Sequence, residues 1–166
     1  MEYAGKQAVV VGIGVSNMPL IRYLVGKGAQ ITACDRQPAA KLGERAEELR
    51  ALGVALATGD GYLAPLADHD LIFLTPGIPK HLPEIVAARE RGATILGEVG
   101  LVLAACRAPI IGITGSAGKT TTTTLVGAIL TAAGRDVHVG GNIGTPLIER
   151  VETIAPDAAV VLELSS

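Results

Sequence analysis

The chain has 166 residues, of which 49% are hydrophobic and 2% aromatic, and its formal net charge is −2. It therefore lacks the basic stripe and the basic patches with interleaved aromatics that nucleic-acid-binding proteins use. No run of 18 predominantly apolar residues occurs and no cationic start precedes an apolar segment, so the sequence predicts a cytoplasmic protein. Cys34 and Cys106 stand beside apolar residues and are expected to be buried free thiols.

The first predicted elements form a βαβ unit: a buried strand at 7–12, a helix at 18–27 and a second strand at 31–34. Gly12 and Gly14 follow the first strand, and Asp35 ends the second. This arrangement is similar to the dinucleotide-binding fingerprint, except that Asn17 stands where the third glycine is expected. Two interpretations stay open. One is a nucleotide or nucleotide-sugar site at the carboxyl ends of the strands, and the other is a tight turn with Asp35 as a solvated strand end.

Strands and helices alternate as far as residue 97. Helices are expected at 39–52 and 82–91, and strands at 54–57, 70–74 and 93–96. The loop Thr75–Pro79, which contains Gly77, either ends its strand or lines a ligand groove at the same sheet edge. Residues 1–97 are therefore predicted to form a Rossmann-like α/β domain with a parallel sheet, followed by a connecting helix and linker at 98–108.

A second segment has the layout of a phosphate-binding loop. A β-branched run at 110–113 enters Thr-Gly-Ser-Ala-Gly-Lys-Thr at 114–120, and a helix with apolar residues at helical spacing follows at 121–133. In such a loop Lys119 would contact the β- and γ-phosphates of a nucleotide and the hydroxyl of Thr120 would bind Mg²⁺. The strict pattern requires glycine at Ile113, so this is a shorter variant, and a plain strand-to-helix turn is the alternative.

A second glycine-rich loop lies at 140–146, between a strand predicted at 136–140 and a short helix at 146–151. The last predicted strand, at 158–164, contains one acid, Glu163. Burying it would be costly without a partner, which a Mg²⁺ ion could supply, and the alternative is an edge-strand acid facing water. We expect 109–166 to be the front part of a larger nucleotide-binding domain, with an exposed sheet edge near 160–164 at which the chain self-associates.

These segments together resemble the Mur ligases, especially the members that add D-glutamate. The segments that carry the resemblance are GIGVS (12–16), CDR (34–36), TPGIP (75–79), GITGSAGKTTTTTLVG (112–127), GGNIG (140–144) and LELSS (162–166). The resemblance implies an ATP-dependent amide ligase of peptidoglycan synthesis. In that reaction ATP converts the carboxylate of UDP-N-acetylmuramoyl-L-alanine into an acyl phosphate, which the amino group of D-glutamate attacks. The second segment would then be the start of a P-loop ATPase domain.

The resemblance also implies the sites. It assigns the UDP-sugar to Gly14, Val15, Ser16, Asp35, Arg36, Gly77 and Asn142, the last at the muramoyl-alanine end. It assigns ATP to Gly115, Ser116, Ala117, Gly118, Lys119, Thr120 and Thr121. It assigns Mg²⁺ to Thr120 and Glu163, and catalytic roles to Lys119 and Glu163.

The chain departs from the family pattern in three ways. Ser116 and Ala117 replace a Thr-Asn pair, which removes a side-chain contact at 117, and Gly100 replaces an acid. The family's later histidine and modified lysine metal ligands and its C-terminal domain are not in this sequence, so the chain is expected to be inactive alone. An NAD(P)-binding Rossmann module using Gly12, Gly14 and Asp35, or a different P-loop ATPase, is the alternative function.

Overall fold

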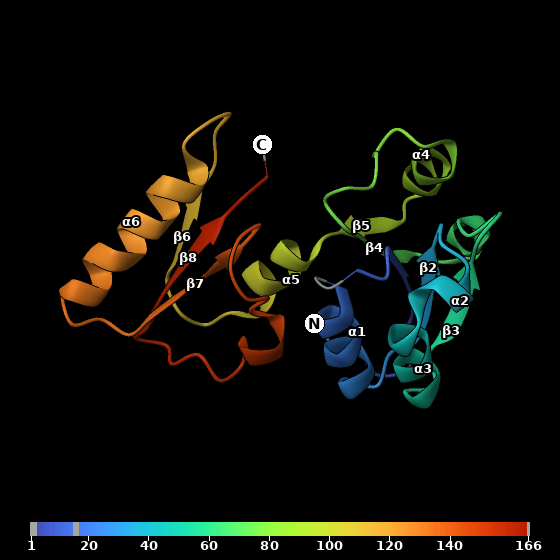
Figure 1. Ribbon diagram of the computed structural model, residues 1–166, viewed down its shortest axis with the longest axis horizontal. Helices are drawn as coiled ribbons and strands as arrows, with labels where there is room; N and C mark the ends of the chain where they lie inside the picture. The colour runs from blue at the N-terminus through green and yellow to red at the C-terminus, as the bar shows by residue number, and fades with distance from the viewer. Residues whose placement is uncertain (1–2, 15–16, 166) are drawn as a thin grey trace. The chain divides into compact units, whose positions relative to one another are not determined.

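The computed structural model describes residues 3–14 and 17–165, and the chain divides into two compact units, residues 1–98 and 99–166 (Figure 1). Each unit contains one sheet in which every strand pair is parallel. The predicted parallel α/β fold class is therefore confirmed. None of the described helices combines the length and apolar character needed to cross a membrane.

The first unit is built on a five-stranded sheet. Its strands are β1 (Gln7–Val11), β2 (Gln30–Asp35), β3 (Ala55–Thr58), β4 (Leu71–Leu74) and β5 (Thr94–Leu96), in the spatial order β3-β2-β1-β4-β5. The central strand β1 is an almost continuous apolar run because helices cover both of its faces. In the register of the sheet Val11 lies opposite both Cys34 and Leu74, so the carboxyl ends of β1, β2 and β4 meet at one edge.

Helices cover this sheet on both sides. They are α1 (Asn17–Gly26), α2 (Ala39–Leu42), α3 (Glu44–Ala51), the 3₁₀ helix η1 (Ala64–Asp68) and α4 (Pro83–Glu90). Figure 1 shows α1 and α3 on one side and α4 on the other. A single core cluster joins the face of β1 that carries Val9 and Val11 to residues of η1 and α4.

One local prediction in this unit needs correction, and one element was not predicted. The single helix predicted at 39–52 is wrong, because Gly43 has a φ of +56° and separates α2 from α3. Glycine takes positive φ without the steric cost that a Cβ imposes, so the break is local in origin. The 3₁₀ helix η1 has no counterpart among the predicted elements, since five residues are too few to show helical periodicity.

The second unit contains a three-stranded sheet in the order β6-β8-β7. Its elements are α5 (Glu98–Ala105, whose first residue closes the first unit), β6 (Ile110–Ile113), α6 (Lys119–Ala132), β7 (Val137–Gly141), the 3₁₀ helix η2 (Ile148–Arg150) and β8 (Ala159–Glu163). All five residues of β8 are buried, and the strand is paired on both sides. The expected exposed edge at 160–164 is therefore wrong, and with it the reason for expecting self-association at this strand.

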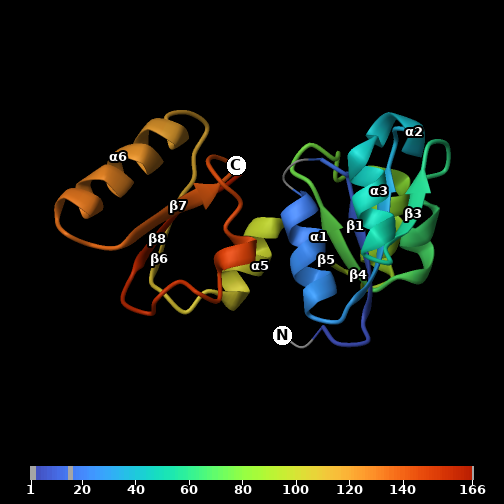
Figure 2. The ribbon, with the colours of Figure 1, turned by 60° about the horizontal axis from the view of Figure 1, so that its bottom comes forward.

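Helix α6 packs on one face of this sheet. A Cβ added to Gly127 would lie 2.7 Å from Cγ2 of Val139, so the helix backbone lies directly against β7. The buried residues of α6 are Thr123 and Gly127, whereas Leu125 and Ile129 are 57% and 58% exposed. Figure 2 shows α5 and the turn containing η2 on the opposite side of the sheet from α6.

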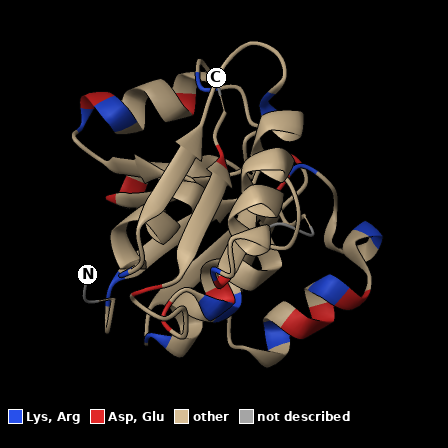
Figure 3. Cartoon of the chain, turned by 90° about the vertical axis from the view of Figure 1, so that its left-hand side faces the viewer, with Lys and Arg blue, Asp and Glu red and all other residues tan. Residues whose placement is uncertain are grey.

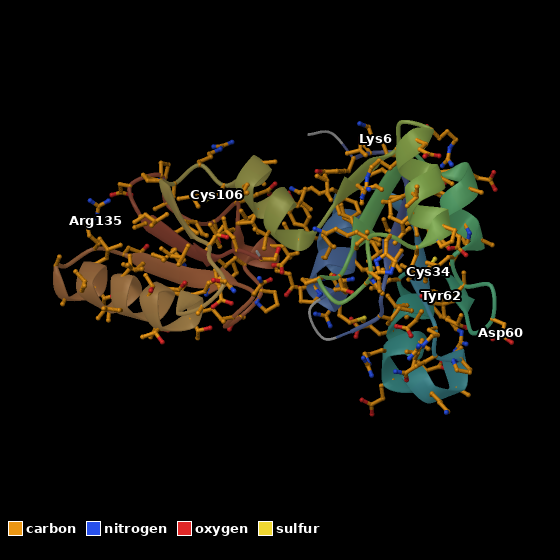
Figure 4. All side chains as sticks on the ribbon, turned by 90° about the horizontal axis from the view of Figure 1, so that it is seen from above. Lys6, Cys34, Asp60, Tyr62, Cys106 and Arg135 are labelled. Carbon is orange, nitrogen blue, oxygen red and sulfur yellow. The ribbon has the colours of Figure 1, made fainter. Side chains whose placement is uncertain are left out.

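The charged residues and the two cysteines occupy different parts of the fold. Charged residues gather on the helices and loops, while the strands are almost free of them (Figure 3). Cys34 is fully buried in the first unit, and Tyr62 packs against the same core cluster (Figure 4). Cys106 is only partly buried, so the expectation of burial is confirmed for Cys34 and wrong for Cys106.

Candidate functional site

The turn after β1 lies at the point where the strand order of the first sheet reverses. Gly12 has a φ of +96°, and a Cβ on it would lie 2.9 Å from Cγ2 of Thr75, the residue after β4. The N–H of Gly12 donates to the carbonyl of Cys34, and the N–H of Thr75 donates to that of Val11. Ligands of open parallel sheets bind at such switch points, so this edge suits the described members of the predicted UDP-sugar site in this unit, which are Gly14, Asp35, Arg36 and Gly77.

Asn17 takes the place of the expected third glycine and has a structural role of its own. Its side chain is 2% exposed, and Nδ2 donates to the carbonyls of Gly12 at 2.8 Å and Val11 at 3.2 Å. The carbonyl of Val11 also accepts from the N–H of Thr75, whereas Asn17 is the described partner of the carbonyl of Gly12. The sequence analysis treated Asn17 only as a departure from a motif. An amide beside a strand end was the available signal for this role.

Asp35 is not a freely solvated strand end. Its Oδ2 accepts a 2.7 Å hydrogen bond from the N–H of Ile13, and its Oδ1 accepts one of 2.8 Å from the N–H of Gln37. The carboxylate therefore fixes the turn after β1. Each carboxylate oxygen has two lone pairs, so the group keeps capacity for a ligand donor.

The other predicted residues of this edge differ in their surroundings. Arg36 and Gly77 are exposed, and Gly14 is partly exposed. A Cβ on Gly77 would meet nothing within 4 Å, so no steric reason in this unit requires glycine there. Val15 and Ser16 lie outside the described residues.

The loop between β6 and α6 contains glycines with positive φ and leads directly into a helix, as the predicted phosphate-binding loop requires. Gly115 and Gly118 have φ values of +141° and +75°, and Gly118 is the N-cap of the 14-residue α6. No described residue accepts a hydrogen bond from the N–H of Gly115, Ser116, Ala117 or Gly118. Backbone donors of this kind at a helix N-terminus favour an anion.

Lys119 lies over this loop and not in a packed interior. Its Nζ donates a 2.8 Å hydrogen bond to the carbonyl of Gly115, and the residue is partly buried. Ser116, Ala117, Thr120 and Thr121 are exposed around it. The structure thus brings the predicted phosphate-binding residues together on one turn of the chain.

The two predicted Mg²⁺ ligands are in direct contact. Oγ1 of Thr120 donates to Oε2 of Glu163 at 2.7 Å, although 43 residues separate them. Glu163 is 6% exposed and lies opposite Ile113, the last residue of β6. Among the described residues no group of three or more His, Cys, Asp or Glu could hold a metal ion. One carboxylate and one hydroxyl nevertheless suit Mg²⁺, which takes its remaining oxygen ligands from phosphates and water.

The second glycine-rich loop is held against the same glutamate. A Cβ on Gly141, whose φ is +96°, would lie 2.2 Å from the carbonyl oxygen of Glu163. The N–H of Asn142 donates to that oxygen at 3.0 Å, and Asn142 itself is exposed. Glycine at 141 is thus needed for close approach of the two strand ends. The sequence analysis found the loop but missed this contact, because strand order cannot be seen in local sequence.

Cys34 is excluded as a nucleophile. Its burial, with a smaller contribution from the charge of Asp35, raises the pKa of the thiol to about 12. Since the thiolate is the reactive form, this cysteine is inert at neutral pH.

Comparisons with known proteins agree with these features. The family model described as "Mur ligase MurD-like, N-terminal domain" matches residues 6–97. A UDP-N-acetylmuramoylalanine–D-glutamate ligase of Symbiobacterium thermophilum is 73% identical over 161 residues, which cover 97% of this chain and 35% of that protein. The ligase of the same name from Clostridium botulinum is 50% identical over 161 residues, with the same coverage of 97% and 35%.

Solved structures give the same picture. The pseudomurein peptide ligase type C from Methanothermus fervidus matches with a TM-score of 0.53 and 25% identity, covering 98% of this chain and 33% of that one. The chain spans 35% of the length of the curated relatives described above. Because the family model covers more than half of the sequence, the chain belongs to the Mur ligase family, with a MurD-like N-terminal domain at residues 6–97.

Proposed function

We propose that the chain supplies the UDP-sugar-binding domain, at 1–97, and the front part of a P-loop ATP-binding domain, at 109–166, of an amide ligase. This ligase joins D-glutamate to UDP-N-acetylmuramoyl-L-alanine in peptidoglycan synthesis. The observation that supports this proposal best is the contact between Thr120 and Glu163, which lies beside a loop whose backbone amides have no described acceptor. The names of the two closely similar relatives supply the substrates. We place the reaction in the cytoplasm, where ATP and UDP-linked sugars are made.

The residues of the second unit would act mainly by positioning and charge. Backbone N–H groups from Gly115 to Gly118 would hold the phosphates, and Lys119 would exchange the carbonyl of Gly115 for phosphate oxygens. Thr120, Thr121 and Glu163 lie at the same end of α6 and would orient the metal and the nucleotide. Bound Mg²⁺ would neutralise phosphate charge and so favour transfer of the γ-phosphoryl group to the substrate carboxylate. Amide formation follows when the amino group of D-glutamate displaces phosphate from that carboxyl carbon.

The residues of the first unit would bind the nucleotide part of the substrate. Gly14, Val15 and Ser16 would form the turn that receives it, and Asp35 would use its free lone pairs to accept from ligand N–H or O–H groups. Arg36 and Gly77 would complete the edge. Asn142, in the second unit, would contact the muramoyl-alanine end.

The NAD(P)-binding alternative has less support. In dinucleotide sites the third glycine allows close packing of helix and strand, and the acid at the end of the second strand is available to the ribose. Here Asn17 fills the glycine position and bonds to the carbonyls of Val11 and Gly12. An NAD(P)-binding module would also leave the phosphate-loop pattern at 114–120 without a role.

Isothermal titration calorimetry on the 166-residue chain tests both halves of the proposal. We expect binding of UDP-N-acetylmuramoyl-L-alanine, and separately Mg²⁺-dependent binding of a non-hydrolysable ATP analogue. NADH fluorescence titration is the control and should show no binding. Binding of NADH without binding of the UDP-sugar would contradict the proposal, as would the absence of heat with both nucleotides at millimolar concentration.

A further inference from the structure

Ile13 is held through both of its backbone polar groups by side chains from distant parts of the first unit. Its N–H donates to Oδ2 of Asp35 at 2.7 Å, and its carbonyl accepts from Nη1 of Arg45, also at 2.7 Å. Asp35 lies 22 residues away at the end of β2, and Arg45 lies 32 residues away on α3. The side chain of Ile13 is 1% exposed, so it anchors the same residue in the core.

These two hydrogen bonds fix the backbone at Ile13, in the turn that is predicted to bind the nucleotide. Gly12 and Gly14 flank Ile13 and have no side chains that could fix their backbone, so the turn depends on contacts made by its neighbours. Asn17 fixes the carbonyl of Gly12, and the carbonyl of Gly14 accepts from the N–H groups of Asn17 and Met18 at the start of α1. The carbonyl of Ile13 is the remaining acceptor, and Arg45 is its partner.

Arg45 also changes the charge around the turn. The carboxylate of Asp35 bonds directly to this turn, so its negative charge would repel a diphosphate bound there. The guanidinium of Arg45 donates to the carbonyl of Ile13 and so brings a positive charge to the same turn.

We propose that Arg45 is a positioning residue for the UDP part of the substrate, acting through the carbonyl of Ile13. This inference rests on the proposed function, because it assumes that the turn after β1 binds UDP. It adds a residue of α3 to the site, although α3 contains none of the short motifs from which the sequence analysis assigned site residues. Arg45 orients the loop and balances the charge of Asp35.

The test measures the affinity of the 166-residue chain for UDP by calorimetry and by ¹⁵N–¹H shifts of the amides at 12–14. We expect Arg45→Ala to raise the Kd for UDP about tenfold, the size of effect typical of one lost charge-assisted hydrogen bond. Arg45→Lys, which keeps the charge and one donor, should recover part of that loss. In the absence of UDP, the differences in ¹⁵N–¹H chemical shift between Arg45→Ala and the wild type should be confined to the turn after β1 and its neighbours.

Arg50→Ala is the matched control. Arg50 lies on the same helix and pairs with Glu47, away from Ile13, so its removal should leave the Kd for UDP unchanged. Asp35→Asn combined with Arg45→Ala should show non-additive effects, because both residues act on Ile13. A folded Arg45→Ala protein that binds UDP as tightly as the wild type would overturn the inference alone. A wild-type chain that binds no UDP would overturn the proposed UDP site together with it.

Discussion

Thr120 and Glu163 are joined by a 2.7 Å hydrogen bond from the hydroxyl at the start of α6 to a carboxylate at the end of β8. The bond connects the loop proposed to hold phosphates with the only acid of the central strand of the second sheet. It orients both side chains before any ligand arrives. Several of the expected mutational effects depend on this contact.

Removing the hydroxyl should destabilise the second unit. Thr120→Val keeps the shape of the side chain but leaves the buried carboxylate of Glu163 without its donor, which costs about 1–3 kcal/mol of unfolding free energy. Urea denaturation of the variant measures this. Thr124→Val is the matched control, since the described hydrogen bond of the Thr124 hydroxyl goes to the carbonyl of Thr120 on an exposed face. Equal stability of the two variants would contradict the role given to the contact.

Removing the charge of Glu163 should abolish the Mg²⁺ dependence of nucleotide binding. In Glu163→Gln the amide still accepts from Thr120 but no longer attracts a divalent cation, since Mg²⁺ prefers carboxylate oxygens. We expect the affinity for a non-hydrolysable ATP analogue to be the same with Mg²⁺ and with EDTA in this variant, and to differ in the wild type. A variant that keeps the full Mg²⁺ effect would remove Glu163 from the proposed site.

Replacing Lys119 should weaken nucleotide binding with little effect on stability. Its described hydrogen bond goes to the carbonyl of Gly115, which is partly exposed and can be hydrated instead, so Lys119→Met should change the unfolding free energy by less than about 1 kcal/mol. The ATP-analogue Kd should rise by at least about tenfold, the equivalent of 1.4 kcal/mol. Arg135→Met provides the control, because Arg135 is a cation beyond the other end of α6 and bonds to the carbonyl of Asp157. Similar losses in both variants would point to non-specific charge attraction.

Gly141→Ala should be among the most damaging single changes in the second unit. The new Cβ would lie 2.2 Å from the carbonyl oxygen of Glu163 at a φ of +96°, so β7 and β8 would have to separate. We expect a loss of more than about 3 kcal/mol, from the combined steric collision and positive φ. Gly134→Ala separates the two causes, since Gly134 has a φ of +78° but open space around it. Thermal unfolding should therefore show a much smaller loss for Gly134→Ala.

The buried thiol of Cys34 should make stability depend on alkaline pH. Its pKa rises from an ordinary 9.0 to about 12 in the folded protein. The unfolded chain therefore releases this proton above pH 9 while the folded chain keeps it. The contribution is complete below pH 9 and is lost between pH 9 and 12, by at most about 1.4 kcal/mol per pH unit.

The variant Cys34→Ala lacks this pH-dependent contribution of the thiol to the unfolding free energy. Urea denaturation at pH 8 and pH 10 should show the wild type losing about 1 kcal/mol more than the variant. Iodoacetamide at neutral pH should label the partly buried Cys106 before Cys34. Parallel pH dependence of the wild type and the variant would show that Cys34 titrates as an ordinary thiol.

The order of strands and helices followed from local patterns. Short β-branched runs such as 7–11 and 110–113 alternate with amphipathic segments, and glycines mark the turns between them. These are properties of neighbouring residues, so periodicity and turn chemistry were sufficient. The same reasoning found the loop at 114–120 and its helix, because the strand, the loop and the helix form one continuous piece of chain.

The lateral order of the strands was decided only in the tertiary structure. Local sequence does not state that β8 lies between β6 and β7, which is why Glu163 could be read as an edge acid and is instead buried against Thr120. For the same reason the sequence could not show that the side chains of Arg45 and Asp35 both bond to Ile13. Such contacts join residues 22 to 43 positions apart, and only the packing of helices on sheets brings those residues within hydrogen-bonding distance. The sequence by itself determined which residue types were available for the proposed chemistry, and the packing decided which of those residues lie in contact.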